Sequence, residues 1–328
     1  MHGLAARLTF AGRRLLQAVP VVLAIVVLNF LLLKLAPGDA AEVLAGEAGS
    51  ATAEYMQQLR AQFGLDQPVW LQLARYIQKM VVLDLGFSFR HSMPVFDLVL
   101  NRLGPTLLLM GVTLVVSVGL GTLLGVIAAL RVNRWPDTVI SVVALLAYAT
   151  PLFWVGLMLI VVFSINLGWL PTSGMATVAA FHEGWDRVAD IARHLVLPAI
   201  TLSLFYMALY TRLMRAAMLE QFGVDYVVTA RAKGLTERRI TFAHVLRNAI
   251  LPVVTMAGVQ MGGLLGGAVV VEAVFAWPGL GQLAFQSLFA RDFNLLLGIF
   301  FFSACLVVVV NLLIDMVYTL IDPRIELK

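Results

Sequence analysis

Residues 105–130 read PTLLLMGVTLVVSVGLGTLLGVIAAL, a run that contains no charged side chain. An α-helix rises 1.5 Å per residue, so about 20 apolar residues cross the roughly 30 Å hydrocarbon core of a bilayer. This stretch exceeds that length, whereas helices in soluble proteins carry polar residues on one face. The segment therefore predicts a transmembrane helix, and it sets the class of the whole chain.

The composition of the 328-residue chain agrees with a membrane protein. Apolar residues make up 61% and charged residues 13%, against about 45–50% and about 25% in soluble domains. The mean hydropathy is +0.92. So few charges could not cover a soluble surface, and the composition also excludes a disordered, fibrous or disulfide-stapled secreted protein. The single cysteine, Cys305, can form no intrachain disulfide.

Five further segments are long and apolar enough to span a bilayer: 15–35, 138–164, 195–213, 250–274 and 295–321. The first of them could pass for a signal peptide, because Arg13 and Arg14 precede it. Its apolar core of about 20 residues is longer than the usual 7–15, so we expect a retained span rather than an export signal. The pattern predicts an all-α integral membrane protein with six transmembrane helices.

The distribution of Lys and Arg predicts the orientation. With the N-terminus inside, segments 1–14, 131–137, 212–249 and 322–328 face the cytoplasm and hold fourteen basic residues, against three in the short outer loops. Both termini are then cytoplasmic. Segment 36–104 becomes a long extracytoplasmic region, and residues 105–328 become a five-helix core with an inner loop at 214–249. The net charge of +4 follows from this asymmetry, and we expect no nucleic-acid partner.

Proline and glycine predict local features of the spans. Pro151 lies inside segment 138–164 and should kink it, either for packing or for movement during transport. Gly121 and Gly125 are four residues apart, a spacing that lets helix backbones approach closely. A second ridge of this kind lies in the fifth span at Gly258, Gly262 and Gly266.

The motifs of catalysis and nucleotide binding are missing from the sequence. It has no G-x-x-x-x-G-K-[ST], H-E-x-x-H or G-x-S-x-G pattern. His182, Glu183 and His194 share an outer loop, but they do not form a metal motif, and we expect no metal site. Ionisable groups in the spans lie mostly near their ends, which disfavours an ion-coupled carrier or a membrane-embedded enzyme. They are Lys34, Glu272 and Asp315.

The inner loop is basic and strongly patterned. Asp225 is a good N-cap for a two-turn helix, and Gly234 can take the left-handed position that ends it. Thr236 can cap the next helix, which leads into the fifth span. A slim, capped helix of this kind suits a groove on another protein, although contact of a basic loop with anionic lipid is the alternative.

Several stretches of this chain resemble one known family. Residues 226–252, YVVTARAKGLTERRITFAHVLRNAILP, resemble the signature loop of ABC-importer permease subunits in the dipeptide, oligopeptide and nickel branch. Similar agreement occurs at LKLAPGDAAEVL (33–44), in the outer segment 63–89, at EAVFAWPGLGQLAFQSLFARDF (272–293) and at LIDMVYTLIDPRIE (313–326). Two departures are Ala40, where proline is usual, and Val228-Thr229, where the general pattern has Glu-Ala.

The resemblance implies a function and a set of partners. The chain would form half of a channel with a second, similar permease in a bacterial inner membrane, for import of dipeptides or oligopeptides. Two cytoplasmic ATPase subunits would bind ATP and magnesium, so this chain would hold no cofactor and catalyse no reaction. A substrate-binding protein would dock outside, and lipid would surround the spans. Nickel or glutathione is the alternative cargo.

The resemblance also implies which residues meet the partners. The inner loop would carry a coupling helix that fits a groove on the ATPase subunits. Its contacts would be Asp225, Tyr226, Thr229, Ala230, Arg231, Ala232, Lys233, Gly234, Leu235, Arg238 and Arg239. Glu272 and Asp292 are the expected contacts at the outer mouth or with the binding protein.

Overall fold

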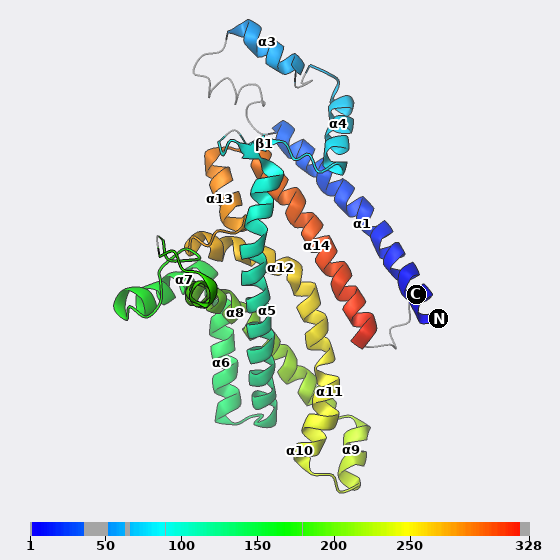
Figure 1. Cartoon of the computed structure of the whole chain (residues 1–328). Coiled ribbons are helices and arrows are strands. Elements are labelled where there is room, and N and C mark those ends of the chain that lie inside the picture. The colour runs from blue at the N-terminus through cyan, green and yellow to red at the C-terminus, as the bar shows by residue number, and fades with distance from the viewer. Residues whose placement is uncertain (1, 36–51, 63–65, 89, 179, 322–328) are drawn as a thin grey trace. The chain divides into compact units, whose positions relative to one another are not determined.

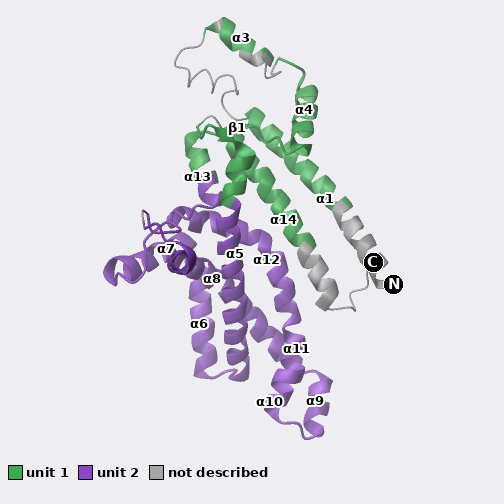
Figure 2. Ribbon diagram, in the orientation of Figure 1, with its two compact units in different colours: residues 1–102, 284–328 green, residues 103–283 purple. Residues whose placement is uncertain are grey.

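The computed structural model describes residues 2–35, 52–62, 66–88, 90–178 and 180–321. The protein is about 81% helical (Figure 1). It divides into two compact units, one formed by residues 1–102 and 284–328 and the other by residues 103–283 (Figure 2). We call them the terminal unit and the central unit and describe each by itself.

The candidate membrane spans agree with the hydropathy of the sequence. Five helical stretches within the described residues are long and apolar enough to cross a bilayer: 16–35, 95–130, 184–222, 237–274 and 293–312. A sixth is a helix pair, residues 135–149 and 152–166, bent by 104°. The described residues therefore hold five candidate spans, or six if the bent pair counts as one broken span.

The bend falls where the sequence predicts a kink. Helix α6 (Trp135–Ala149) ends before Thr150, and Pro151 precedes α7 (Leu152–Leu159), which continues as the π-helical segment η1 (Ile160–Asn166). Proline lacks a backbone N–H and disfavours helical conformation in the residue before it. Thr150 accordingly has an extended ψ of 133°. The predicted kink is a complete break of the helix.

The terminal unit contains α1 (His2–Leu35), α3 (Ala53–Gln62), α4 (Val69–Val81) and α14 (Phe293–Ile321), with the first turns of α5 (Val95–Leu130) and most of α13 (Leu280–Ala290). Helices α1 and α14 pack side by side, and Nδ2 of Asn29 donates to the Leu297 carbonyl at 3.2 Å. Helix α4 packs on α1, where the Phe30 and Tyr76 rings lie 5.8 Å apart. Burial raises the pKa of Tyr76 to about 12, so this phenol stays neutral.

A hairpin of two short strands, each two residues long, also belongs to the terminal unit. Strands β1 (Phe87–Ser88) and β2 (Met93–Pro94) are antiparallel, with Phe87 opposite Pro94 and Ser88 opposite Met93. Helix α5 begins directly after β2 at Val95, ten residues before the start that hydropathy predicts. Its first turns include Asp97, Asn101 and Arg102. These polar residues precede the apolar run, so hydropathy places the start of the span too late in the chain.

The central unit is built around α8 (Gly184–Phe222). Helices α6, α7 and α12 (Leu251–Val274) pack against it. A Cβ added at Gly125 of α5 would lie 2.6 Å from Cβ of Met214, and one at Gly121 would lie 2.7 Å from Cβ of Tyr210. The predicted close packing at Gly121 and Gly125 is therefore confirmed. Side chains with almost no exposed surface fill the core, including Leu202, Tyr210, Met214, Leu264 and Trp277.

Candidate functional site

The loop that carries most of the predicted contacts folds as two short helices below α8. Helix α9 (Asp225–Ala232) follows Phe222 after a short turn, and α10 (Glu237–Arg239) opens a continuous helical stretch. That stretch passes through the π-helical η2 (Ile240–Val245) and α11 (Leu246–Ala249) into α12. The loop is therefore joined to a candidate membrane span without an intervening coil.

Helix α9 has one packed face and one exposed face. Val227 and Ala230 are buried, with exposed fractions of 0% and 6%, and α9 packs against η2. Asp225, Thr229 and Ala232 are exposed on the opposite side. The predicted N-cap is wrong by one residue, because Val224 occupies the cap with extended backbone and Asp225 already lies in the first helical turn.

Gly234 ends α9 as the sequence predicts. Its φ is +75°, in the left-handed region that glycine adopts without strain. The Gly234 N–H donates to the Arg231 carbonyl at 2.9 Å, and the Leu235 N–H donates to the Ala230 carbonyl at 3.2 Å. These two bonds form a Schellman motif, which satisfies carbonyls that the helix leaves open and fixes the direction of the chain after it.

The next helix is also capped, and a salt bridge joins the two. The Thr236 hydroxyl accepts from the Arg239 N–H at 3.4 Å, which confirms the predicted cap. Nε of Arg231 donates to Oε1 of Glu237 at 2.7 Å, and a second guanidinium nitrogen lies 3.3 Å from Oε2. The Glu237 carboxylate raises the pKa of Arg231, which therefore remains charged. The loop is thus held by backbone, hydroxyl and ionic contacts together.

Glu237 was not among the predicted site residues. It lies six positions after Arg231, a spacing that does not place two side chains on one face of a helix. The two residues meet because the left-handed turn at Gly234 reverses the chain between them. An Arg and a Glu that flank a helix-ending glycine are the signal that could have indicated the pair.

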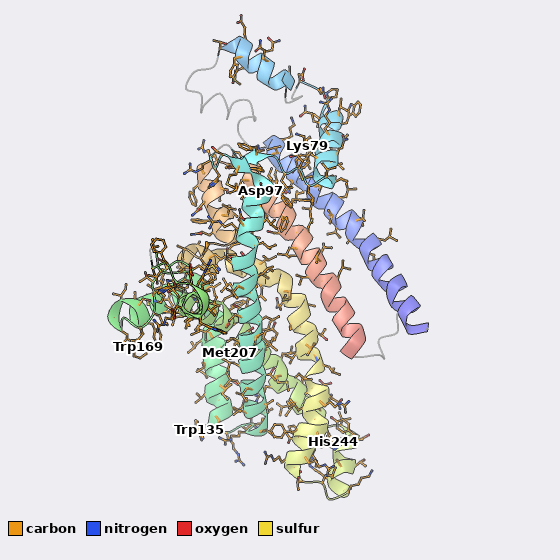
Figure 3. The ribbon with its side chains drawn as sticks, viewed as in Figure 1. Lys79, Asp97, Trp135, Trp169, Met207 and His244 are labelled. Carbon is orange, nitrogen blue, oxygen red and sulfur yellow. The ribbon has the colours of Figure 1, made fainter. Side chains whose placement is uncertain are left out.

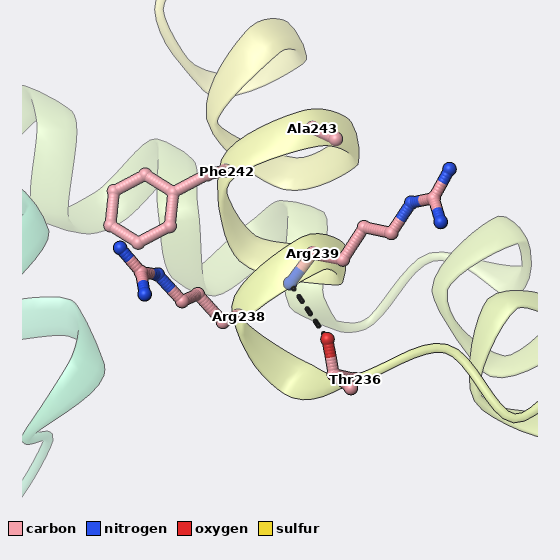
Figure 4. Close-up of a pocket in the computed structure, with 5 residues that line it drawn as sticks. All are labelled: Thr236, Arg238, Arg239, Phe242 and Ala243. Atoms are coloured by element: carbon pink, nitrogen blue, oxygen red, sulfur yellow. Dashed lines mark hydrogen bonds between the residues drawn. The ribbon is translucent and has the colours of Figure 1, made fainter.

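The remaining basic residues of the loop stay exposed. Arg238 and Arg239 line a shallow depression of about 410 Å³ together with Thr236, Phe242 and Ala243 (Figure 4). Both guanidinium groups, and the ammonium group of Lys233 nearby, lack an ion-pair partner among the described residues. His244 of η2 and Trp135 at the start of α6 lie toward the same end of the central unit (Figure 3). This end of the central unit therefore carries exposed positive charge.

The two acidic residues predicted for the outer mouth have internal partners. Glu272 has an exposed fraction of 0% and accepts from the Thr106 hydroxyl at 2.7 Å and from the Gly281 and Gln282 N–H groups at 2.7 and 3.1 Å. Its carboxylate thus caps the start of α13. A fully buried side chain cannot reach a docked protein, so the prediction for Glu272 is corrected to a structural role.

Asp292 is a helix cap in the terminal unit. One carboxylate oxygen accepts from the Leu295 N–H at 3.1 Å at the start of α14, and the other accepts from the Ser88 hydroxyl at 2.5 Å. Ser88 is fully buried. Both oxygens of Asp292 are therefore engaged within its own unit, although the residue keeps some exposed surface.

His194 and Asp315 are two further ionisable residues named from the sequence. No group of three or more His, Cys, Asp or Glu residues that could hold a metal occurs among the described residues. His194 instead lies beside Asp190, whose carboxylate accepts from the Thr177 backbone and hydroxyl at 2.7 Å each. The side chain of Asp315 lies outside the described part of the chain.

Comparison with known proteins identifies the class. The sequence of the chain matches two family models. Residues 7–110 match the N-terminal part of the membrane component of binding-protein-dependent transport systems, and residues 121–327 match the inner membrane component itself. The chain belongs to the family of inner membrane components of binding-protein-dependent transport systems. The family resemblance read from the sequence motifs is confirmed.

Several relatives match over nearly their whole length. The chain is 41% identical to a putative peptide permease protein of Brucella ovis over 97% of this chain and 99% of that one. It is 41% identical to the oligopeptide transport system permease protein AppB of Bacillus subtilis, with coverage of 96% and 98%. It is 40% identical to the glutathione transport system permease protein GsiC of Escherichia coli O6:H1, with coverage of 98% and 100%.

The fold is similar to that of a solved structure, a chain of the MetNI methionine ABC transporter in an inward-facing conformation, with a TM-score of 0.55 and 17% identity. The match covers 69% of this chain and 96% of that one. At this identity the likeness concerns the fold alone.

Proposed function

We propose that this chain is a permease subunit of a peptide importer and forms half of the channel with a second, similar permease. Relatives over 96–98% of its length are named as peptide, oligopeptide and glutathione permeases. The single observation that carries the mechanism is the capped loop of α9 and α10, which continues as one helical stretch into α12. A push or pull on such a loop moves the span, because no flexible segment absorbs it.

The partners follow from this role. Two ATPase subunits would bind ATP and magnesium and take α9 in a surface groove, while this chain contributes no catalytic residue or cofactor. The exposed face of α9, with Asp225, Thr229 and Ala232, would enter the groove. The cations Lys233, Arg238 and Arg239 would face acidic groups around it. A substrate-binding protein would dock on the opposite side of the membrane, with both termini of this chain cytoplasmic and lipid around the six spans.

Uptake by the assembled importer tests this proposal. Proteoliposomes are prepared with the permease pair, the ATPase subunits and the binding protein. They should accumulate a labelled dipeptide only when ATP is present on the side of the bilayer that the ATPase subunits face. Glutathione and nickel are the competing cargoes. Of the two, glutathione is the cargo in the name of a relative, GsiC. Uptake of nickel or glutathione but not of peptide would contradict peptide as the cargo. Transport by the purified chain alone, driven by an ion gradient, would contradict the importer mechanism and indicate a secondary carrier.

A further inference from the structure

Two arginines one turn apart on α8 have different surroundings. Arg215 forms a bidentate pair with Asp137 of α6, with nitrogen to oxygen distances of 2.6 and 2.8 Å. Asp137 also accepts from the Asn133 N–H at 3.0 Å. Arg212 has no carboxylate partner among the described residues and is exposed. The Arg215 guanidinium is thus paired with a carboxylate, whereas the Arg212 guanidinium can still bind one.

The available guanidinium lies over an aromatic ring far along α6. The central carbon of the Arg212 guanidinium is 4.8 Å from the centre of the Tyr148 ring. Tyr148 is next to last in α6, whereas Asp137 lies in its first turn. Eleven residues separate them, about 16 Å of helix. The Arg212 guanidinium therefore lies near the end of α6 that precedes the break at Pro151, beside an apolar segment and away from the polar first turn of α6.

A stack of aromatic rings holds this position. The Tyr148 and Phe205 rings are nearly parallel, with centres 5.0 Å apart, and Tyr206 meets Phe205 edge-on at 5.2 Å. Tyr206 is buried, whereas Tyr148 is 43% exposed. Helices α6 and α8 pack against each other along this region. The stack is anchored in the core at one end and open at the end where Arg212 lies.

The chemistry of this arrangement favours an anionic ligand. A charge within an apolar span is costly, and such groups usually face a water-filled path or an oppositely charged group. Contact with a ring face attracts the guanidinium but uses none of its five N–H donors. Those donors fit a carboxylate in bidentate fashion. A lipid phosphate fits less well, because the Tyr148 ring that the guanidinium contacts lies eleven residues along α6 from Asp137 in its polar first turn.

We propose that Arg212, supported by Tyr148 and Phe205, lines the translocation path and binds a carboxylate of the passing substrate. The proposal rests on the proposed function, since every unmodified peptide carries a C-terminal carboxylate. Arg215 and Asp137 hold α6 and α8 together beside this site. Hydropathy placed Arg212 at the end of a span and gave no sign of this role.

Thiol labelling tests whether position 212 meets water. Cys305 is the only cysteine, so Cys305→Ser gives a cysteine-free chain, into which Arg212→Cys is introduced within the assembled importer. A charged, water-soluble methanethiosulfonate should modify the new thiol, whereas Val143→Cys, on the exposed apolar side of α6, should react at least ten-fold more slowly. Failure of the Arg212→Cys thiol to react would overturn the proposal in favour of burial by lipid or a partner chain.

Transport with matched peptides tests the ligand. Arg212→Gln should lower uptake of a labelled dipeptide about ten-fold or more while changing uptake of its C-terminal amide less than two-fold, and Arg212→Lys should restore part of the loss. Arg215→Gln should reduce both peptides equally. Equal loss of both peptides in Arg212→Gln, or no loss, would overturn the proposal. If the wild-type importer rejects the amide, equal loss in the Gln and Lys variants overturns it instead.

These outcomes separate the two proposals. A wild-type importer that moves neither peptide contradicts peptide import as the function. Labelling of the Arg212→Cys thiol in that same complex would still place position 212 on an aqueous path. An unreactive thiol at this position, in a complex that imports peptide, would contradict the role of Arg212 alone.

Discussion

The Thr106 hydroxyl donates a 2.7 Å hydrogen bond to Oε1 of Glu272, 166 residues further along the chain. The same hydroxyl accepts from the Leu280 N–H at 2.8 Å, and the Trp277 indole donates to the Pro105 carbonyl at 2.9 Å. These bonds join α5, the end of α12 and the start of α13 within the central unit. They give the EAVFAWPGLG stretch a physical role, because its acid caps the helix that follows.

Removal of the Thr106 hydroxyl should destabilise this junction. Thr106→Val keeps the shape of the side chain but leaves the Leu280 N–H without that acceptor, at a cost of about 1–3 kcal/mol. We expect a lower unfolding temperature of the detergent-purified protein. Thr255→Val is the matched control, because Thr255 is exposed and its hydroxyl donates to the Leu251 carbonyl of its own helix. Equal unfolding temperatures for the two variants would contradict the structural role of Thr106.

The contact of α5 with α8 leaves no room for a methyl group at Gly125. In Gly125→Ala the new Cβ would lie 2.6 Å from Cβ of Met214 and 2.7 Å from the Thr211 carbonyl oxygen, so the helices must separate. Overpacking of this kind costs about 1–3 kcal/mol. We expect less monodisperse protein after heating in detergent.

Gly119 provides the control for this contact. It lies on the same helix, and a Cβ there would have no neighbour within 4 Å. Gly119→Ala should therefore leave thermal stability unchanged or raise it slightly, because alanine favours helix by up to about 1 kcal/mol. A loss as large as that of Gly125→Ala would show that the close contact is not the cause.

Substitution of Gly234 should uncouple transport from ATP hydrolysis. In Gly234→Pro, φ is fixed near −65°, far from the observed +75°, and the N–H that donates to Arg231 is lost. We expect uptake to fall at least ten-fold while the protein still inserts in the membrane and its ATPase partners hydrolyse ATP. Gly223→Ala is the control, because Gly223 has an ordinary φ of −86°. Normal uptake by Gly234→Pro would remove the coupling role of the loop.

The salt bridge between Arg231 and Glu237 should stabilise the loop, and exchanging the two charges should restore it. Arg231→Glu and Glu237→Arg each place like charges opposite one another, and we expect each to lower ATP-dependent uptake a few-fold. The double variant restores the attraction in reverse and should recover most of the uptake. A double variant as impaired as the single ones would indicate that each residue acts through separate contacts with a partner.

The local features of this protein could be read from its sequence. The spans follow from runs of apolar residues, and the break at Pro151 follows from a missing N–H and a restricted neighbour. Gly234 and Thr236 end one helix and begin the next because each acts on backbone groups within four residues. The contact at Gly121 and Gly125 was likewise indicated by spacing alone.

Tertiary structure decided what the ionisable groups do. The sequence predicts outer contacts for both Glu272 and Asp292, but the structure buries Glu272 completely and bonds it to Thr106, 166 residues away. Asp292 accepts from Ser88 across 204 residues, and its contact with a binding protein stays a prediction. Arg212 and Arg215 are alike in sequence, and only the path of α6 gives one a carboxylate and the other an aromatic ring. A charge in an apolar bundle takes its role from its nearest neighbours in space, and hydropathy, which averages along the chain, does not contain them.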